Sequence, residues 1–228
     1  NPASNEPLLA ALSSHLVEHN FDLKSLMRLI LQSETYQRSS EVVSENRDDT
    51  RFFSHYYPRR HMAEVLHDAI AEVAEVPSVF KKIKLNDGST QDTKFYEDET
   101  RALELYDSAV ESYFLKTFGR NERDIVCECE RSNQPSMVQV LHLANGDTLN
   151  EKLRQKDGVV DQLLKEKAKD TAALVEQAYL RTLSRKPTEK ELKGFVEMID
   201  AAPEKEKHEA VEDLFWAMMT SREFLFQH

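Results

Sequence analysis

The sequence predicts an all-α fold, an irregular multi-helix bundle with long loops, and three observations lead to that prediction. The chain has only 5 Gly in 228 residues, which disfavours sandwiches and barrels because their many turns require glycine. Apolar residues recur at helical spacing along most of the chain. Helix start and stop signals flank these stretches. Residues 81–96 are an exception, because Asn86-Asp87-Gly88 is a turn signal that indicates one small β-hairpin with Lys94-Phe95-Tyr96 on its return strand.

The length allows one substantial core. We expect residues 1–228 to form one helical domain. In it, residues 1–157 supply the N-terminal helices and an irregular loop region, and residues 158–228 form a C-terminal helical bundle packed on them.

Two helices are expected at the start of the chain. Asn5 and Pro7 are typical of a first helical turn, and the apolar stripe that follows consists of Leu8, Leu9, Leu12, Leu16 and Val17. Asp22 has the position of a cap for a second helix, whose inward face would carry Leu23, Leu26, Met27 and Ile30. The short link between them predicts an antiparallel pair.

The clearest helical pattern precedes Pro77 and consists of Met62, Val65, Leu66, Ala69, Ile70 and Val73. A short buried helix is expected from Ser136, with Met137, Val140, Leu141 and Ala144 on one face. Asn145-Gly146 would end it because both residues tolerate a left-handed backbone. Thr148 and Glu151 then have the spacing of a capping box.

Helical signals continue to the carboxyl end. Val160 to Leu183 form either one helix or two with Thr171 at the joint, and Thr188 and Glu191 form another capping box. The residues at the centres of the stripes should be buried, namely Leu12, Leu26, Leu66, Ile70, Val140, Leu141, Val175, Phe195 and Phe215.

Net charge and hydropathy disfavour two classes of binding partner. The net charge of −11 repels phosphate backbones and anionic lipid headgroups, so we expect no nucleic-acid partner. No apolar run has the length of a bilayer span, so we expect no membrane insertion. The oligomeric state is left open.

Three phrases of the sequence resemble a known family. They are NPASNEPLLAAL with DLKSLMRLILQSETYQRSS, the central CECERSNQPSMVQVLHLANGDTLNEKL, and the closing LSRKPTEKEL with TSREFLFQH. In this order they resemble domain of unknown function 1553, the C-terminal domain of cytochrome c-associated multidomain proteins of planctomycetes and verrucomicrobia. The resemblance implies an exported multidomain protein, placed in the periplasm or at the cell surface, with further domains upstream. The family has no agreed catalytic residues, so none is carried over.

The central segment holds the one candidate metal constellation, Cys127, Cys129 and His142. Two thiolates and an imidazole suit zinc or copper. Alternate side chains of an extended segment point to opposite faces, however, and a fourth ligand is not apparent. We therefore favour structural cysteines, and we expect no metal and no cofactor in this chain. Haem attachment is set aside because C-x-x-C-H does not occur.

Arginines mark a possible contact with an anion or a partner. Arg59 and Arg60 stand before the helix that ends at Pro77, where backbone N–H groups and guanidinium groups can converge on an anion, and Arg131 lies in the central segment. The alternative is that arginine pairs with Glu64 and Asp68 on the helix surface. His15 and His19 are one helical turn apart, but they lack the H-E-x-x-H pattern, so we interpret them as solvated.

Two functions remain after this reading. The chain is either a non-catalytic helical module that packs on upstream domains of its own polypeptide or on a surface protein or glycan, or it contributes part of a redox or polysaccharide-active site that upstream domains complete. No catalytic motif decides between them, so enzymatic activity stays open.

Overall fold

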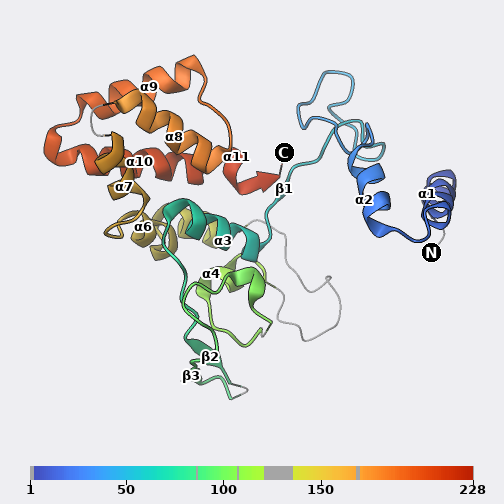
Figure 1. Ribbon diagram of the computed structural model, residues 1–228, viewed down its shortest axis with the longest axis horizontal. Helices are drawn as coiled ribbons and strands as arrows, with labels where there is room; N and C mark the ends of the chain where they lie inside the picture. The colour runs from blue at the N-terminus through green and yellow to red at the C-terminus, as the bar shows by residue number, and fades with distance from the viewer. Residues whose placement is uncertain (1–2, 86, 107, 121–135, 168–169, 228) are drawn as a thin grey trace. The chain divides into compact units, whose positions relative to one another are not determined.

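The structure is a computed structural model that describes residues 3–85, 87–106, 108–120, 136–167 and 170–227 (Figure 1). It is mostly helical, as predicted, with two small two-stranded sheets where the sequence indicates one hairpin. The chain forms two compact units, one up to Arg59 and the other from Arg60 to Gln227. In the second unit, buried residues from both sides of position 157 belong to the same hydrophobic core.

The first unit begins with α1 (Glu6–Glu18) and α2 (Leu23–Leu31), the two blue helices of Figure 1. Asn5 caps α1 by accepting from the amide of Leu8, and Asp22 caps α2 by accepting from the amides of Lys24 and Ser25. Both helices therefore start where the sequence predicts. Asn20 and Phe21 in the link have positive φ angles of 53° and 62°.

Asp49 organises the loop that follows α2. Its carboxylate accepts from the amides of Arg51, Phe52 and Ser54 and from the Ser54 hydroxyl. These hydrogen bonds, with that of the Ser54 hydroxyl largest, hold the pKa of Asp49 far below its ordinary value. The loop presents Phe52 and Phe53 to solvent.

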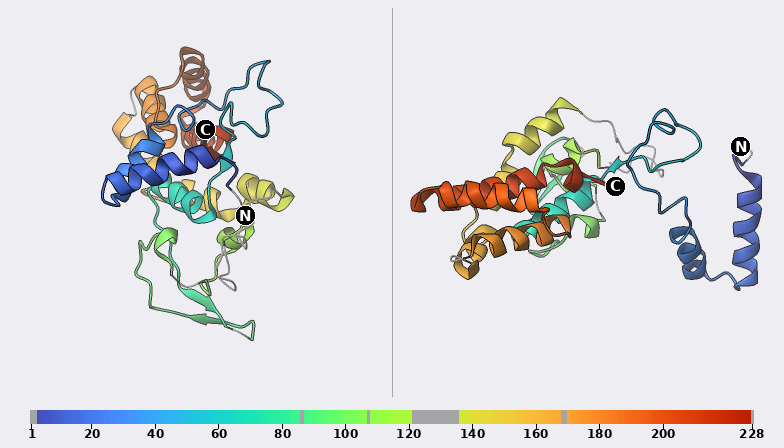
Figure 2. Two further views of the ribbon diagram at one scale, coloured as in Figure 1. Left: turned by 90° about the vertical axis from the view of Figure 1, so that its right-hand side faces the viewer. Right: turned by 90° about the horizontal axis from the view of Figure 1, so that it is seen from above.

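The helices described in the second unit are α3 (Ala63–Ala74), η1 (Ala102–Glu104), α4 (Tyr113–Thr117), α5 (Met137–Asn145), α6 (Asp147–Leu153), α7 (Val159–Lys167), α8 (Thr171–Leu183), α9 (Glu189–Ala201), η3 (Glu204–Glu206), α10 (Lys207–Met219) and α11 (Arg222–Leu225). Helices α8, α9 and α10 lie against one another (Figure 2). Thr188 and Glu191 form the predicted capping box of α9. Asp170 caps α8, so residues 159–183 form two helices rather than one.

Strands are short in this protein. β2 (Lys82–Lys84) pairs antiparallel with β3 (Thr90–Asp92), with Ile83 opposite Gln91, and this hairpin extends away from the helices of its unit (Figure 1). It confirms the predicted hairpin, but the return strand is residues 90–92 instead of 94–96. The other sheet joins β1 (Arg59–Arg60) to β4 (Phe226–Gln227).

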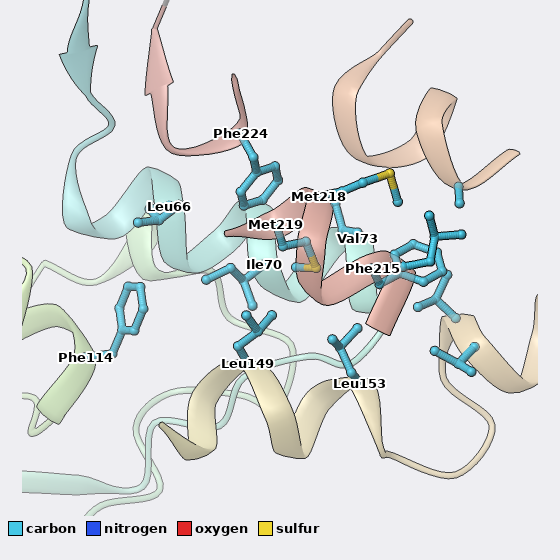
Figure 3. Close-up of a cluster of buried hydrophobic side chains, with 14 of the residues drawn as sticks. Leu66, Ile70, Val73, Phe114, Leu149, Leu153, Phe215, Met218, Met219 and Phe224 are labelled. Atoms are coloured by element: carbon cyan, nitrogen blue, oxygen red, sulfur yellow. The ribbon is translucent and has the colours of Figure 1, made fainter. Parts of the chain in front are cut away.

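The core is built where α3 and α10 meet α6 (Figure 3). Leu66 and Ile70 of α3 are fully buried. Their neighbours in this cluster are Val73, Phe114, Leu149, Leu153, Phe215, Met218, Met219 and Phe224. Burying this much apolar surface is the main stabilising term of the second unit.

The predicted core is correct in the second unit apart from residues of α5 and α9. Leu66, Ile70, Val175 and Phe215 are buried as expected, whereas Leu12, Leu26 and Phe195 are partly exposed. The prediction for α5 is wrong, since Val140 and Leu141 are each 56% exposed.

Gln139 explains the orientation of α5. Its side chain is buried, its amide nitrogen donates to the Thr117 carbonyl at 2.9 Å, and its amide oxygen accepts from the Ser136 amide at 3.2 Å. A guanidinium nitrogen of Arg60 also donates to that oxygen. These hydrogen bonds turn the polar side of α5 inward, so the apolar residues Met137, Val138, Val140 and Leu141 face solvent.

Two local predictions near Gly146 are also wrong. Helix α5 ends at Asn145, but Gly146 has a φ of −77° rather than a left-handed angle. Glycine is required there for space, because a Cβ would lie 2.2 Å from the His142 carbonyl oxygen. Helix α6 starts at Asp147 without a side-chain cap, so Thr148 and Glu151 form no capping box.

Candidate functional site

The predicted metal constellation falls mostly outside the described residues. This holds for Cys127 and Cys129, and also for Arg131 of the predicted anion contact. His142 is described: its Nε2 lies 3.1 Å from the Thr148 hydroxyl, and its ring packs beside Tyr113 and Phe114. Burial lowers the pKa of His142. Among the described residues, no group of three or more His, Cys, Asp or Glu side chains is arranged to hold a metal ion.

The arginines ahead of α3 have different surroundings. Arg59 is exposed. Arg60 donates to the Phe118 carbonyl at 3.0 Å and to Gln139, and its guanidinium lies over the Phe118 ring at 5.4 Å. Burial lowers the pKa of Arg60. Arg60 thus ties the end of α4 to the start of α5, and an anion contact there stays a prediction.

The carboxylates of α3 also have partners inside the unit. Glu64 lies 3.9 Å from the guanidinium of Arg120 in a largely buried pair. Asp68 accepts from the amides of Ala102 and Leu103 at 2.6 and 3.0 Å. In the first unit, the rings of His15 and His19 stack at 3.9 Å, and His15 Nε2 lies 3.1 Å from the Ser25 hydroxyl.

A cavity of about 310 Å³ lies beside the segment that follows α3. His67 of α3, Ser78 and Phe80 of the segment, and Lys152 of α6 all line it. Three carboxylates, Glu111, Asp147 and Glu151, lie on the same lining. Its size is at the lower end of the range for small-molecule sites.

His67 is the best-buried polar group of this cavity. Its side chain is only 7% exposed, and its ring packs against Phe80 and Phe114 at 5.5 and 5.4 Å between ring centres. Its Nε2 lies 3.4 Å from Ser78 Oγ, and its Nδ1 lies 3.6 Å from an Asp68 carboxylate oxygen. The three side chains therefore stand in the order serine, imidazole, carboxylate.

Two charged groups near His67, Asp68 and Lys152, are fixed by hydrogen bonds. Burial alone would raise the pKa of Asp68, but the neighbouring His67 ring and the hydrogen bonds from the amides of Leu103 and Ala102 bring the pKa below its ordinary value. Lys152 Nζ donates to the carbonyls of Val76 and Pro77 at 2.6 and 3.1 Å. Burial lowers the pKa of Lys152 to about 8.

A second cavity, of about 690 Å³, also borders this segment. Val76, Pro77 and Ser78 line both cavities, and Asp68 lines the second one. The segment that carries Ser78 therefore borders both cavities.

Sequence reasoning missed this arrangement. In the sequence, His67 and Asp68 are polar positions of a predicted helix, and Ser78 is the residue after a proline. Lys152 lies 74 positions after Ser78. No spacing rule links the four residues. The fold of α6 against α3 is the only signal that brings them together.

The first unit offers a surface in place of a cavity. None of the apolar side chains described in residues 3–59 is buried. On α1, α2 and their link, the large exposed ones are Leu8, Leu9, Val17, Phe21, Leu23, Met27, Leu29, Ile30 and Leu31, which we call the N-terminal apolar surface. Leu23 and Met27 are 63% and 62% exposed. Monomeric soluble proteins rarely leave so many large apolar residues together in water.

Within the described ranges, the structure contains no helix long and apolar enough to cross a bilayer.

Comparisons with known proteins give the family alone. No curated protein and no solved structure matches this sequence significantly. The family PSD1, described as a protein of unknown function (DUF1553), matches residues 1–199, which is most of the chain. The chain therefore belongs to this family of unknown function.

Proposed function

We propose that this chain is a packing and binding module of a larger exported protein, and that the first unit docks on upstream domains of the same polypeptide. The N-terminal apolar surface carries the proposal. Its helices are well capped, yet neither buries an apolar side chain. Amphipathic helices obtain most of their stability from packing, so a partner that covers this surface is required.

The chemistry of the surface favours a protein partner. Its residues are mainly aliphatic, whereas glycan sites rely on polar groups and aromatic faces. Helices that lie on anionic lipid carry a polar face rich in Lys and Arg. Positions 1–59 hold six Lys and Arg residues against eight Asp and Glu residues, a net charge of −2. An apolar, uncharged face on a neighbouring protein domain is the best match.

A partner in the same polypeptide fits better than a separate one. An aliphatic surface of this extent would aggregate if it waited in solution for a partner. A covalently linked domain is present at high effective concentration from synthesis onward, so the surface would be covered as soon as both parts fold. The family resemblance motivates our proposal that upstream domains exist and that the protein is periplasmic or at the cell surface.

The test is one double variant that introduces two charges, made both in the full polypeptide and in this chain alone. Leu23→Asp with Met27→Asp places two carboxylates on the N-terminal apolar surface. We expect a lower melting temperature and faster proteolysis of the full polypeptide, because a buried unpaired charge is costly. The melting temperature of the isolated chain should not change, because both side chains are exposed there.

Lys24→Asp is the matched control, because Lys24 is an exposed polar residue on the same helix. It should leave both proteins unchanged. If the double variant leaves the full polypeptide as stable and as protease-resistant as the wild type, the docking proposal is wrong. The sequence predicts a non-catalytic module over the whole chain, and the docking proposal concerns the first unit alone.

A further inference from the structure

We propose that Ser78 and His67 are a nucleophile and its general base, oriented by Asp68, and that they transfer acyl groups from small neutral or cationic esters bound in the 310 Å³ cavity. The inference goes beyond docking and rests on the second unit alone. It starts from the three side chains that the fold brings together around the segment after α3.

The contacts have the polarity that acyl transfer needs. Ser78 Oγ lies 3.4 Å from His67 Nε2, so that nitrogen can accept the hydroxyl proton. His67 Nδ1 lies 3.6 Å from Asp68 Oδ1, and a proton on Nδ1 points the free lone pair at Ser78. The Ser78 distance is long for a hydrogen bond, and the Asp68 distance is beyond one, so His67 Nδ1 has no hydrogen-bond partner among the described residues. Such contacts commonly tighten only when a substrate binds.

The surroundings hold these groups in place. Phe80 and Phe114 pack on the His67 ring, and two backbone amides fix the Asp68 carboxylate. Lys152 holds both carbonyls that precede Ser78. A site preorganised in this way loses little energy to reorganisation during reaction.

The reaction balances without a co-reactant other than water. Ser78 Oγ bonds to the ester carbonyl carbon while its proton passes to His67 Nε2. The carbonyl then re-forms, the carbon–oxygen bond to the alcohol breaks, and the alcohol leaves with the proton from His67. Water, deprotonated by the same imidazole, next attacks the acyl–Ser78 ester and releases the acid, which returns Ser78 and neutral His67.

Lys152 and the carboxylates define the substrate class. Two of the three ammonium N–H groups of Lys152 are used on carbonyls, and the third can donate to the oxygen that becomes negative during attack. Glu111, Asp147 and Glu151 on the lining repel anionic acyl donors and attract cationic ones. Its volume restricts the donor to a small molecule.

The test is covalent labelling of the complete 228-residue chain with diisopropyl fluorophosphate, which phosphorylates activated serines. We expect one adduct, on Ser78, located by peptide mass spectrometry. Ser78→Ala should abolish the adduct, and His67→Gln should slow its formation about 100-fold or more. The cationic ester 3-acetoxy-N,N,N-trimethylanilinium should be hydrolysed at least about 10-fold more efficiently than the anionic ester 3-acetoxybenzoate at low salt.

Ser89→Ala is the matched serine control. Its hydroxyl donates to a carboxylate, Asp87, at 2.6 Å in the hairpin, so labelling at Ser78 should not change. Circular dichroism melts of each variant show whether it is folded. An unlabelled Ser78 in the folded wild type, or a folded His67→Gln variant that labels at the wild-type rate, overturns the proposal. Equal hydrolysis of the two esters overturns the substrate class.

Discussion

Helices α2 and α3 show the same apolar pattern in sequence and have opposite fates in the structure. α3 buries seven residues, among them Leu66 and Ile70, whereas α2 buries none. Within its unit, α2 touches α1, but α3 is surrounded by α4, α6, α7 and η1. An apolar stripe therefore predicts that one face of a helix packs against other residues. Whether those residues belong to the same unit depends on the rest of the fold.

The largest expected effect separates the two helices directly. Leu66→Ala should destabilise the chain by about 2–5 kcal/mol, because it leaves a cavity in a fully buried site. Met27→Ala in α2 should change stability by less than about 0.5 kcal/mol, since its side chain is largely exposed. Urea unfolding of both variants measures the difference. Equal losses would mean that the two helices are covered alike in the isolated chain.

The next effect concerns the helix whose predicted orientation is wrong. Gln139→Ala should cost about 1–3 kcal/mol, because it leaves the Thr117 carbonyl and the Ser136 amide without their partner. Thermal melts followed by circular dichroism check this loss. A neutral result would show that α5 is not held by its polar side.

An ion cluster in the second unit gives a pH prediction. Arg185 donates to both oxygens of Glu191 and of Glu223, and its guanidinium lies 5.2 Å from the centre of the Tyr179 ring. The Arg185 hydrogen bonds lower the pKa of Glu191 to about 2. A lowered carboxyl pKa stabilises above the ordinary value near 4.5, and this contribution is lost as pH falls towards 2.

The expected loss from Glu191 is about 1–2 kcal/mol between pH 5 and pH 2, reduced by the partial exposure of the pair. Urea unfolding at these pH values measures it, and Glu191→Gln should flatten the pH dependence. Glu197→Gln on the same helix is the control, because its pair with Lys193 is exposed at 3.8 Å. If both variants show the wild-type pH dependence, the cluster does not contribute.

The smallest expected effect belongs to the exposed face of α5. Val140→Ser should change stability by less than about 0.5 kcal/mol, since the side chain is largely exposed. Denaturant unfolding with a precision of about 0.3 kcal/mol is sufficient. A loss above about 1 kcal/mol would show that this face is covered and that the sequence-based prediction of burial was right.

Much of the fold could be predicted from local signals. Caps such as Asp22 and Thr188 lie at the helix starts that the sequence indicates, and the stripe through Leu66 and Ile70 is core. The prediction that Val140 is buried was wrong. The side-chain amide of Gln139 forms hydrogen bonds with partners 22 and 79 positions away, and these hold the polar side of α5 inward although four apolar residues are thereby exposed. Apolar periodicity contains no information about such distant polar partners.

The candidate site was less accessible to sequence reasoning. His67, Asp68 and Ser78 are close in sequence, but the loop that carries Ser78 is held by Lys152 from α6. That contact is tertiary, so no motif could indicate it. The cysteines drew attention because they are rare, yet rarity is a property of composition and carries no geometry.

The most direct test of the central claim is amide hydrogen exchange across α1 and α2, measured in this chain alone and in the full polypeptide. The docking account predicts fast exchange over residues 6–31 in the isolated chain and strong protection of the same residues in the full polypeptide. Residues 63–74 of α3 should be protected equally in both. Equal exchange of residues 6–31 in the two proteins would contradict the account.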